Sequence, residues 1–271
     1  MSLEQTIADL VAASNNLTGT INTKMNEIDQ KVDEAVKAIP ELHKEIYVSA
    51  GSGNNSNTGT SGSPVQTIKE AIERIPENGS GEVFLAKGET FRFTESVGFV
   101  SKSITLRSTV QNSVSTDRPI IHLESYKDSG FDWSEAYGMR VSGSATIKLI
   151  NVEVDTGELA TDATSYRASP CGLIARNHFQ GNTAFIDFSA YDSKFKMRGH
   201  PVMSLYGACR VSLSSVEREF IGAGVPFVSA SVFSIYESTT TDSDETLTPA
   251  QIYDGLNTDG SNVITNINLT A

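Results

Sequence analysis

The sequence has few cysteines, one tryptophan and no long apolar run. Its two cysteines, Cys171 and Cys209, form no CxxC motif and have no paired histidine nearby, which argues against a disulfide framework or a zinc site. No apolar stretch approaches the ~20 residues of a membrane helix. Residues 1–10 also lack the basic and apolar regions of a cleaved signal. We expect a soluble chain that is not exported by a cleaved signal, has two buried thiols and holds no metal or other cofactor.

Positive charge is also scarce: the sequence has 21 basic and 33 acidic residues and a formal net charge of −12. No basic stripe is present, so sequence-independent binding to nucleic acid is excluded as a function class. Nucleophile-elbow, phosphate-loop, metalloprotease and dinucleotide motifs are absent from the sequence as well. The length of 271 residues suggests about two structural units.

Residues 3–39 contain no proline and only Gly19, and their apolar positions recur at spacings of three and four, which predicts one long helix that ends before Pro40. Two successive steps of four meet at Ile21 and form a stutter in the heptad pattern. The apolar stripe is too narrow for the side of a globular core, so we expect residues 1–40 to form a parallel homo-oligomeric coiled coil. A helix folded back on its own domain is the alternative. The residues predicted to mediate oligomerisation are Leu3, Ile7, Leu10, Leu17, Ile21, Met25, Ile28, Val32, Ala35 and Ile39.

Residues 41–81 are expected to form a linker and a capping helix. The stretch 49–64 consists almost entirely of Gly, Ser, Asn and Thr, which is typical of an irregular loop. Apolar residues at 65, 68, 71, 72 and 75 then share one face of a short amphipathic helix that ends at Pro76.

Residues 82–271 show repeated short segments of alternating apolar and polar residues, which predict a body of many β-strands. A weak repeat around Pro170, Pro201 and Pro226 has spacings of 31 and 25 residues, the range of repeat architectures. A β-sandwich is the alternative, although few hairpin turn signals are present. The acidic, Thr-rich stretch 237–260 is expected to be a loop with one helical turn at 249–256, serving as a terminal cap or an arm between subunits.

The order of features in residues 46–93 resembles the first segment of right-handed parallel β-helix proteins of the pectate-lyase-like class. These features are Tyr47-Val48, a Gly/Asn-rich loop, Ser63-Pro64, Thr67-Ile68, Ala71-Ile72, Ile75-Pro76, Gly81, Val83-Phe84-Leu85 and Gly88. In that class the helix covers the open end of the solenoid, where strand edges and apolar side chains need cover. The resemblance implies a mainly β fold, a right-handed parallel β-helix preceded by a long N-terminal coiled coil.

A helical stalk that leads into such a segment resembles a bacteriophage tail fibre or tailspike. This second resemblance implies a homotrimer that sits in the virion tail after assembly in the bacterial host cytoplasm. It also implies contacts with other tail or baseplate proteins and with bacterial surface polysaccharide. The function expected from it is structural, with recognition of and attachment to the host surface. The alternatives are a polysaccharide depolymerase, acting as a glycoside hydrolase or a lyase, and a connector fibre that holds another tail protein.

Hydrolysis of a polysaccharide needs two carboxyl groups, and two pairs at i, i+2 spacing, Glu153/Asp155 and Glu217/Glu219, each place two carboxyls on one face of a strand. Outward strand faces are routinely acidic, however, so no catalytic residue is assigned. Lyase chemistry needs a base and a cation, and His178 with Arg176 and His200 with Arg198 supply only the residue types.

The segment 124–140 gathers aromatic and acidic residues in one loop. Aromatic faces can stack on sugars while carboxylates accept hydrogen bonds from hydroxyls, so this composition predicts a glycan-binding loop. The alternative is that its apolar side chains cover the core or a subunit interface. The predicted binding residues are Tyr126, Asp128, Phe131, Asp132, Trp133, Glu135 and Tyr137.

Overall fold

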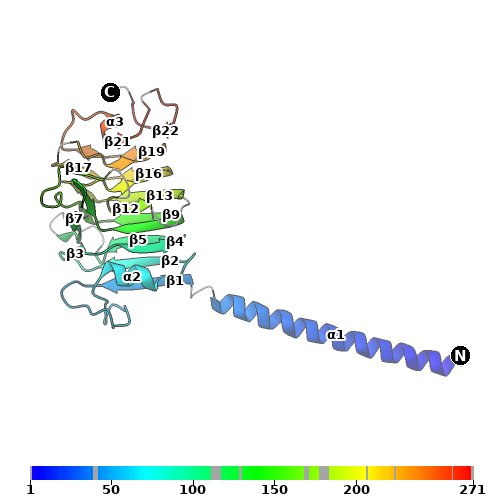
Figure 1. The fold of residues 1–271 in the computed structure, drawn as a ribbon. Helices are drawn as coiled ribbons and strands as arrows, with labels where there is room; N and C mark the ends of the chain where they lie inside the picture. Colours follow the sequence, from blue (N-terminus) through cyan, green and yellow to red (C-terminus); the bar gives the residue numbers. More distant parts are fainter. Residues whose placement is uncertain are drawn as a thin grey trace. The chain divides into compact units, whose positions relative to one another are not determined.

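The computed structural model describes residues 2–38, 42–110, 117–127, 130–167, 171–176, 183–205, 207–222, 224–257 and 259–269 (Figure 1). The side chains of residues 37, 38, 183 and 184 are outside this description. The chain divides into two units, Met1–Leu42 and His43–Ala271. Residues 43–81, predicted to be a linker and a cap, therefore belong to the same unit as the strands.

The first unit is a single helix, α1 (Leu3–Ala38). It confirms the helix predicted from the spacing of apolar residues. Among the residues predicted to mediate oligomerisation, the large apolar ones from Leu3 to Val32 are 49–77% exposed and Ala35 is exposed, whereas Ile39 lies outside the described residues. The apolar stripe is thus present and uncovered, and its role in oligomerisation remains a prediction.

The larger sheet of the second unit contains 13 strands. They are β1 (His43–Val48), β2 (Ser80–Leu85), β4 (Val97–Val100), β5 (Ser103–Ser108), β9 (Met139–Ile150), β12 (Ile174–Arg176), β13 (Thr183–Tyr191), β15 (Met203–Ser204), β16 (Ala208–Ser214), β18 (Val228–Ser229), β19 (Val232–Ser238), β21 (Tyr253–Asp254) and β22 (Val263–Thr265). Nine of them follow the order β21-β18-β15-β12-β9-β13-β16-β19-β22, and the other four join this path through β9.

Strand β9 makes this sheet curl. Its first residues, from Met139, pair in parallel with β4 and β12, and its last residues, up to Ile150, pair in parallel with β5 and β13. Between these two parts Gly143 has φ +72°, and a Cβ added there would lie 2.5 Å from the Oγ of Ser101. Glycine is required at this position because the strand changes direction against a close neighbour.

A second parallel sheet has the order β20-β17-β14-β10-β6-β3. Its strands are β3 (Thr90–Phe93), β6 (Ile120–Leu123), β10 (Glu153–Asp155), β14 (Lys194–Met197), β17 (Glu217–Phe220) and β20 (Thr241–Asp242). A third, small sheet joins β7 (Ser125–Lys127), β8 (Trp133–Ala136) and β11 (Ser165–Tyr166). Among the described strand pairs, β7 with β8 is antiparallel and the others are parallel, so an antiparallel sandwich is excluded.

Two short helices complete the second unit. Helix α2 (Ile68–Arg74) lies in the segment predicted to be helical, and the side chain of Thr67 accepts a hydrogen bond from the backbone N–H of Glu70 at its N-terminus. At the opposite end the carbonyl of Ile72 accepts from the backbone N–H of Ile75 at 3.3 Å and from the Nζ of Lys102 at 2.8 Å. Helix α3 (Pro249–Ile252) lies within the predicted helical turn.

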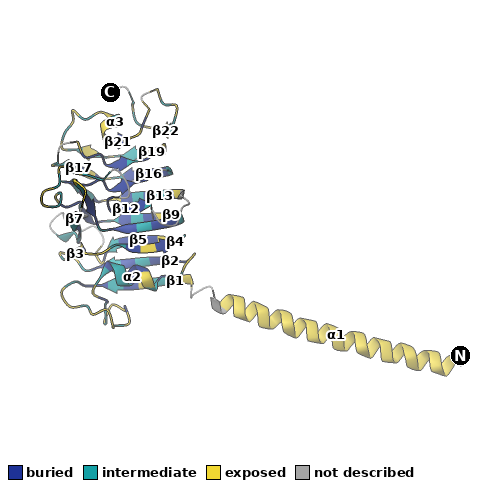
Figure 2. Ribbon diagram, in the orientation of Figure 1, coloured by how far each residue is buried: buried dark blue, intermediate teal, exposed yellow. Residues whose placement is uncertain are grey.

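The core lies between the sheets, as the dark ribbon segments in Figure 2 show. Burial alternates along the strands, for example in β2, where every second residue is buried, because successive side chains of a strand point to opposite faces. The rings of Phe188, Phe195 and Phe227 meet in this core with centroids 5.0–6.4 Å apart. These contacts join β13 and β14 to the segment that precedes β18.

Aligned corners lead from the larger sheet into the second sheet. Asn151, Asp192, Ser215 and Thr239 each follow a strand of the larger sheet and have φ values between 47° and 56°. A strand of the second sheet begins two residues after each of them. Asn and Asp tolerate this left-handed conformation better than most residues. The corner at Asn151 explains why the apolar alternation in residues 145–154 shifts phase there: this stretch is the end of β9, a corner and β10.

The predicted fold class is corrected by this topology. The repeat spacings and the family resemblance predicted a right-handed β-helical solenoid preceded by a coiled coil, with coils of 25–31 residues. The structure instead has one large, mainly parallel sheet that curls around the core, a second parallel sheet and three described helices. Equivalent positions are unevenly spaced: Ala145 pairs with Ile186 (186 − 145 = 41), and Ile186 pairs with Cys209 (209 − 186 = 23). The apolar alternation locates strands, but it does not specify which strands share a sheet.

Candidate functional site: a groove across Tyr166

Two adjoining hollows form a groove on the second unit. The first has a volume of about 480 Å³ and the second about 530 Å³, both within the range of small-molecule sites. They share Tyr166, Gly222, Gly224 and Val225 in their linings. Because the shared residues form the boundary between the hollows, a ligand longer than one hollow would cross Tyr166.

The small third sheet positions Tyr166. Strand β11, which ends at Tyr166, pairs with β8, so that Tyr166 lies opposite Ser134. The backbone N–H of Arg167 donates to the carbonyl of Ser134 at 2.8 Å and continues this pairing. Tyr166 is half-buried, and burial together with the charge of Asp254 raises the pKa of its hydroxyl group. The phenol is therefore a neutral hydrogen-bonding group in the groove, with an aromatic face beside it.

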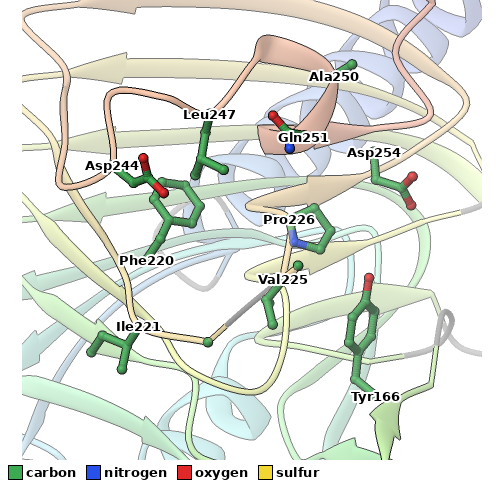
Figure 3. A pocket seen from close by; sticks show the side chains of 12 residues that line it. Tyr166, Phe220, Ile221, Val225, Pro226, Asp244, Leu247, Ala250, Gln251 and Asp254 are labelled. Atoms are coloured by element: carbon green, nitrogen blue, oxygen red, sulfur yellow. The ribbon is translucent and has the colours of Figure 1, made fainter.

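The first hollow carries two carboxylates on different sides, as Figure 3 shows. Asp244 accepts hydrogen bonds from the N–H (3.0 Å) and Oγ1 (2.6 Å) of Thr246, and these bonds lower the pKa of its carboxyl group. Asp254 belongs to β21 and accepts a hydrogen bond from the Oγ of Ser229 at 2.8 Å. Asp254 lies on the side of the hollow occupied by Tyr166. Two carboxylates and a phenol thus surround one cavity.

The apolar part of the first hollow comes from Phe220, Pro226 and Leu247. Leu247 precedes α3, which the Gln251 side chain stabilises by accepting a hydrogen bond from the N–H of Thr248 at 2.8 Å. Gly222 lines both hollows and approaches the neighbouring backbone closely, because a Cβ added there would lie 1.6 Å from the carbonyl oxygen of Arg198. A substitution at Gly222 would therefore displace this part of the groove.

The second hollow has an ion pair on its wall. Arg198 donates to Glu158 at 3.0 Å, and its Nε lies 3.1 Å from Asp155. Burial lowers the pKa of the Arg198 guanidinium, but the two carboxylates outweigh it and raise the pKa. This end of the groove therefore offers a fixed cation beside an exposed carboxylate.

A buried hydrogen-bond cluster holds the loop that forms the wall of the second hollow. The Nδ1 of His200 lies 3.1 Å from the carbonyl of Thr156, which assigns the ring proton to that nitrogen. The Nε2 of His200 then accepts from the Oγ of Ser134 at 2.8 Å, and the same Oγ accepts from the N–H of Ala160 at 2.8 Å. Burial lowers the pKa of His200. His200 is fully buried, so it stabilises the loop and is not the exposed base that lyase chemistry needs.

The described residues of the predicted glycan-binding set lie on or next to the β7–β8 hairpin, whose strand β8 pairs with β11. Tyr126 stacks on Tyr137 with ring centroids 4.4 Å apart, and Phe131 stacks on Trp133 at 4.2 Å. Glu135 is buried, accepting one bond from the hydroxyl of Tyr126 and another from Arg167, both at 2.5 Å.

Thus six of the seven predicted residues come together, and Asp128 lies outside the described residues. None of the six lines either hollow. Phe131, which is 44% exposed, and Asp132 remain available on the outer side of the hairpin.

The predicted carboxylate pairs do share strand faces, but cations neutralise them. Glu153 pairs with Lys196 at 2.7 Å and Asp155 pairs with Arg198 at 3.1 Å, while Glu217 and Glu219 both bind Lys194, at 2.7 and 3.0 Å. They form a ladder of ion pairs across the second sheet. His178 lies outside the described residues.

Sequence reasoning missed the groove because its residues come from three distant segments, around positions 158–166, 198–226 and 244–254. The acidic, Thr-rich stretch that carries Asp244 was interpreted as a cap or an arm between subunits. Within the described residues no group of His, Cys, Asp and Glu could hold a metal ion. No described helix is long and apolar enough to cross a membrane.

Comparison with known proteins gives no matching family model and no matching curated protein. Among solved structures, the chain is similar to the GH136 lacto-N-biosidase from Eubacterium ramulus, with 14% identity and a TM-score of 0.39 over 88% of this chain and 48% of that one. The chain thus spans about half the length of this enzyme.

No family model and no curated protein links the chain to phage tail proteins. The predicted assignment to phage tail fibres or tailspikes, and with it the host-attachment function, is therefore corrected. The homotrimer and the virion location that accompanied this assignment are untested.

Proposed function

We propose that the protein binds a polysaccharide in the groove across Tyr166 and cleaves it by hydrolysis of a glycosidic bond. The observation that carries this proposal is the pair of carboxylates, Asp244 and Asp254, on different sides of the hollow that Tyr166 borders. Glycoside hydrolysis needs two carboxyl groups that flank the scissile bond, one as an acid and the other as a base or nucleophile.

The environment of Asp244 suggests its role. Hydrogen bonds from Thr246 stabilise the ionised form of Asp244 and lower its pKa, so Asp244 suits the role of base or nucleophile. By elimination, the role of the acid that gives a proton to the leaving oxygen goes to Asp254, the other carboxyl group of the hollow. Water supplies the hydroxyl group at the new reducing end, which balances the reaction.

The length of the groove favours a polymer over a single sugar. The second hollow continues beyond Tyr166 and presents Arg198, Glu158 and backbone groups, which can bind hydroxyl or carboxylate substituents of further sugar rings. The face of Tyr166 offers a stacking surface at the boundary, since aromatic rings carry an apolar face with a polar tip.

The test is to incubate the full chain with a panel of neutral and acidic polysaccharides and to measure new reducing ends between pH 4 and 8. We expect a bell-shaped pH profile. The substitutions Asp244→Asn and Asp254→Asn should each lower kcat by about 10²- to 10⁴-fold, the usual contribution of a general acid or base.

Asp259→Asn is the matched control. Asp259 accepts a hydrogen bond from the N–H of Ser261 at 2.9 Å, as Asp244 does from the N–H of Thr246, and its pKa is likewise lowered, but it lines neither hollow. Activity that survives both Asp244→Asn and Asp254→Asn would overturn the assignment of the two carboxylates. Unsaturated uronates among the products would replace hydrolysis with elimination, and polysaccharide binding without cleavage would reduce the groove to a binding site.

A further inference from the structure

Helix α1 presents a long row of exposed apolar side chains. We define the α1 stripe as its large apolar side chains, which are 49–77% exposed: Leu3, Ile7, Leu10, Val11, Leu17, Ile21, Met25, Ile28, Val32 and Val36. The helix has 36 residues and so extends over about 54 Å at 1.5 Å per residue. Soluble proteins rarely expose an apolar patch of this extent without a partner.

The stripe has the geometry of a coiled-coil seam. From Leu3 to Ile21 a heptad register puts Leu3, Leu10 and Leu17 in d positions and Ile7 and Ile21 in a positions, with Ser14 in the a position between them. Beyond the stutter, Met25 and Val32 occupy a positions and Ile28 a d position. Such a seam buries its side chains only against another helix with the same repeat, and a second copy of this chain supplies one.

Charges beside the stripe favour a parallel arrangement of the copies. In this register Lys24 occupies a g position and Asp29 the e position five residues later. In a parallel coiled coil the g residue of one helix meets the e residue of its neighbour, so Lys24 of each copy would face Asp29 of the next. Within one helix Lys24 also contacts Glu27 at 2.6 Å, an exposed i, i+3 pair.

We propose that α1 associates with α1 of further copies of this chain to form a parallel homo-oligomeric coiled coil along the α1 stripe. The assembly places several grooves in one particle. A polymer with repeated binding sites can then engage more than one groove at once, which raises its effective affinity. The association itself does not depend on the proposed hydrolysis.

The first experiment measures the mass of the full chain in solution at micromolar concentration by light scattering. We expect a whole multiple, two or more, of the 29.1 kDa chain mass. Ile28→Glu places a charge in the seam and should shift the mass to 29.1 kDa. Asn26→Glu adds the same charge two residues away, outside the seam, and should leave the assembly intact. A monomeric wild-type chain, or assembly that Ile28→Glu does not change, would overturn the proposal.

A charge exchange tests the parallel register. Asp29→Lys should weaken association a few-fold, because Lys24 would then face a lysine of the neighbouring copy. The double variant Lys24→Glu/Asp29→Lys should restore it, because the pair is re-formed with reversed signs. Recovery in the double variant supports the parallel register, and additive weakening would overturn it. The circular dichroism of each variant reports whether α1 remains helical.

Discussion

Arg218 is predicted to be the most costly single charge to remove from this fold. It lies on β17 with 2% of its side chain exposed. Its guanidinium donates to Asp242 at 2.6 and 2.9 Å and to Glu237 at 2.8 and 3.2 Å. It also donates to the hydroxyl of Tyr253 at 3.0 Å. One side chain thus joins β17, β19, β20 and β21, and the last of these carries Asp254.

The magnitude follows from what the substitution leaves behind. Burial lowers the pKa of Arg218, but the neighbouring Tyr253, Asp242 and Glu237 outweigh burial and raise it, so the cation is firmly held. In Arg218→Leu two largely buried carboxylates would lose their counter-charge. Breaking a buried ion pair in this way costs about 3–5 kcal/mol. For a unit of this size each kcal/mol lowers Tm by roughly 2–4 °C, so the expected decrease is about 6–20 °C.

The assay is urea denaturation followed by circular dichroism, with calorimetry for Tm. Arg218→Lys keeps the charge but loses the two-pronged geometry, so it should lie between the wild type and Arg218→Leu. The triple variant Arg218→Leu/Glu237→Leu/Asp242→Leu removes both stranded charges and should recover much of the loss. A loss below about 1 kcal/mol in Arg218→Leu, the range of an exposed ion pair, would refute the reasoning.

Three further predictions concern the groove, the thiols and the pH dependence of stability. Tyr166→Ala should weaken oligosaccharide binding by about 1–3 kcal/mol, by analogy with aromatic stacking on bases. Titration calorimetry should then show a Kd roughly 5- to 150-fold higher. An unchanged Kd would show that Tyr166 does not contact the ligand. Burial raises the pKa of the Cys171 and Cys209 thiols to about 12, so a thiol reagent at pH 8 should label them only after unfolding, and rapid labelling of the native chain would contradict their burial. Burial lowers the pKa of His200 below its ordinary value of 6.5. As the pH falls, the unfolded chain therefore binds a proton at this imidazole before the folded chain does. The contribution of neutral His200 to the free energy of unfolding is complete above pH 6.5 and decreases below it. The urea midpoint should therefore decrease between pH 7 and 5.5, less so in His200→Gln, and an equal decrease in both chains would assign the effect to other groups.

Local elements could be predicted from the sequence where the periodicity is undisturbed. Helix α1 follows from the apolar spacing of 3–39, and the alternating segments of residues 82–271 predict the many strands found there. The apolar alternation in residues 145–154 also shifts phase at Asn151, where the structure has a corner, but the phase shift alone does not identify a turn.

The arrangement of the strands could not be predicted, because it depends on pairing across distant segments. Strand β9 contributes to two parts of the curled sheet through the bend at Gly143, and no local pattern in the sequence marks that bend. Tyr166 and Asp254 meet at one hollow although 88 residues separate them (254 − 166 = 88). The aromatic hairpin was recognisable by composition, but composition does not reveal that the carboxylate of Glu135 is already occupied by Tyr126 and Arg167.

The aligned left-handed corners make part of the body a transferable module. Asp192 and Ser215 lie 23 residues apart (215 − 192 = 23) at equivalent places in adjacent layers. In a tandem duplication of residues 193–215 the second copy would follow Ser215, which has the same left-handed conformation as the Asp192 that precedes the first copy. It would add one strand to each neighbouring ladder and lengthen the body by about 4.8 Å, the spacing of paired strands. A gene that gained or lost such a module would change the height of the body without requiring new turn residues.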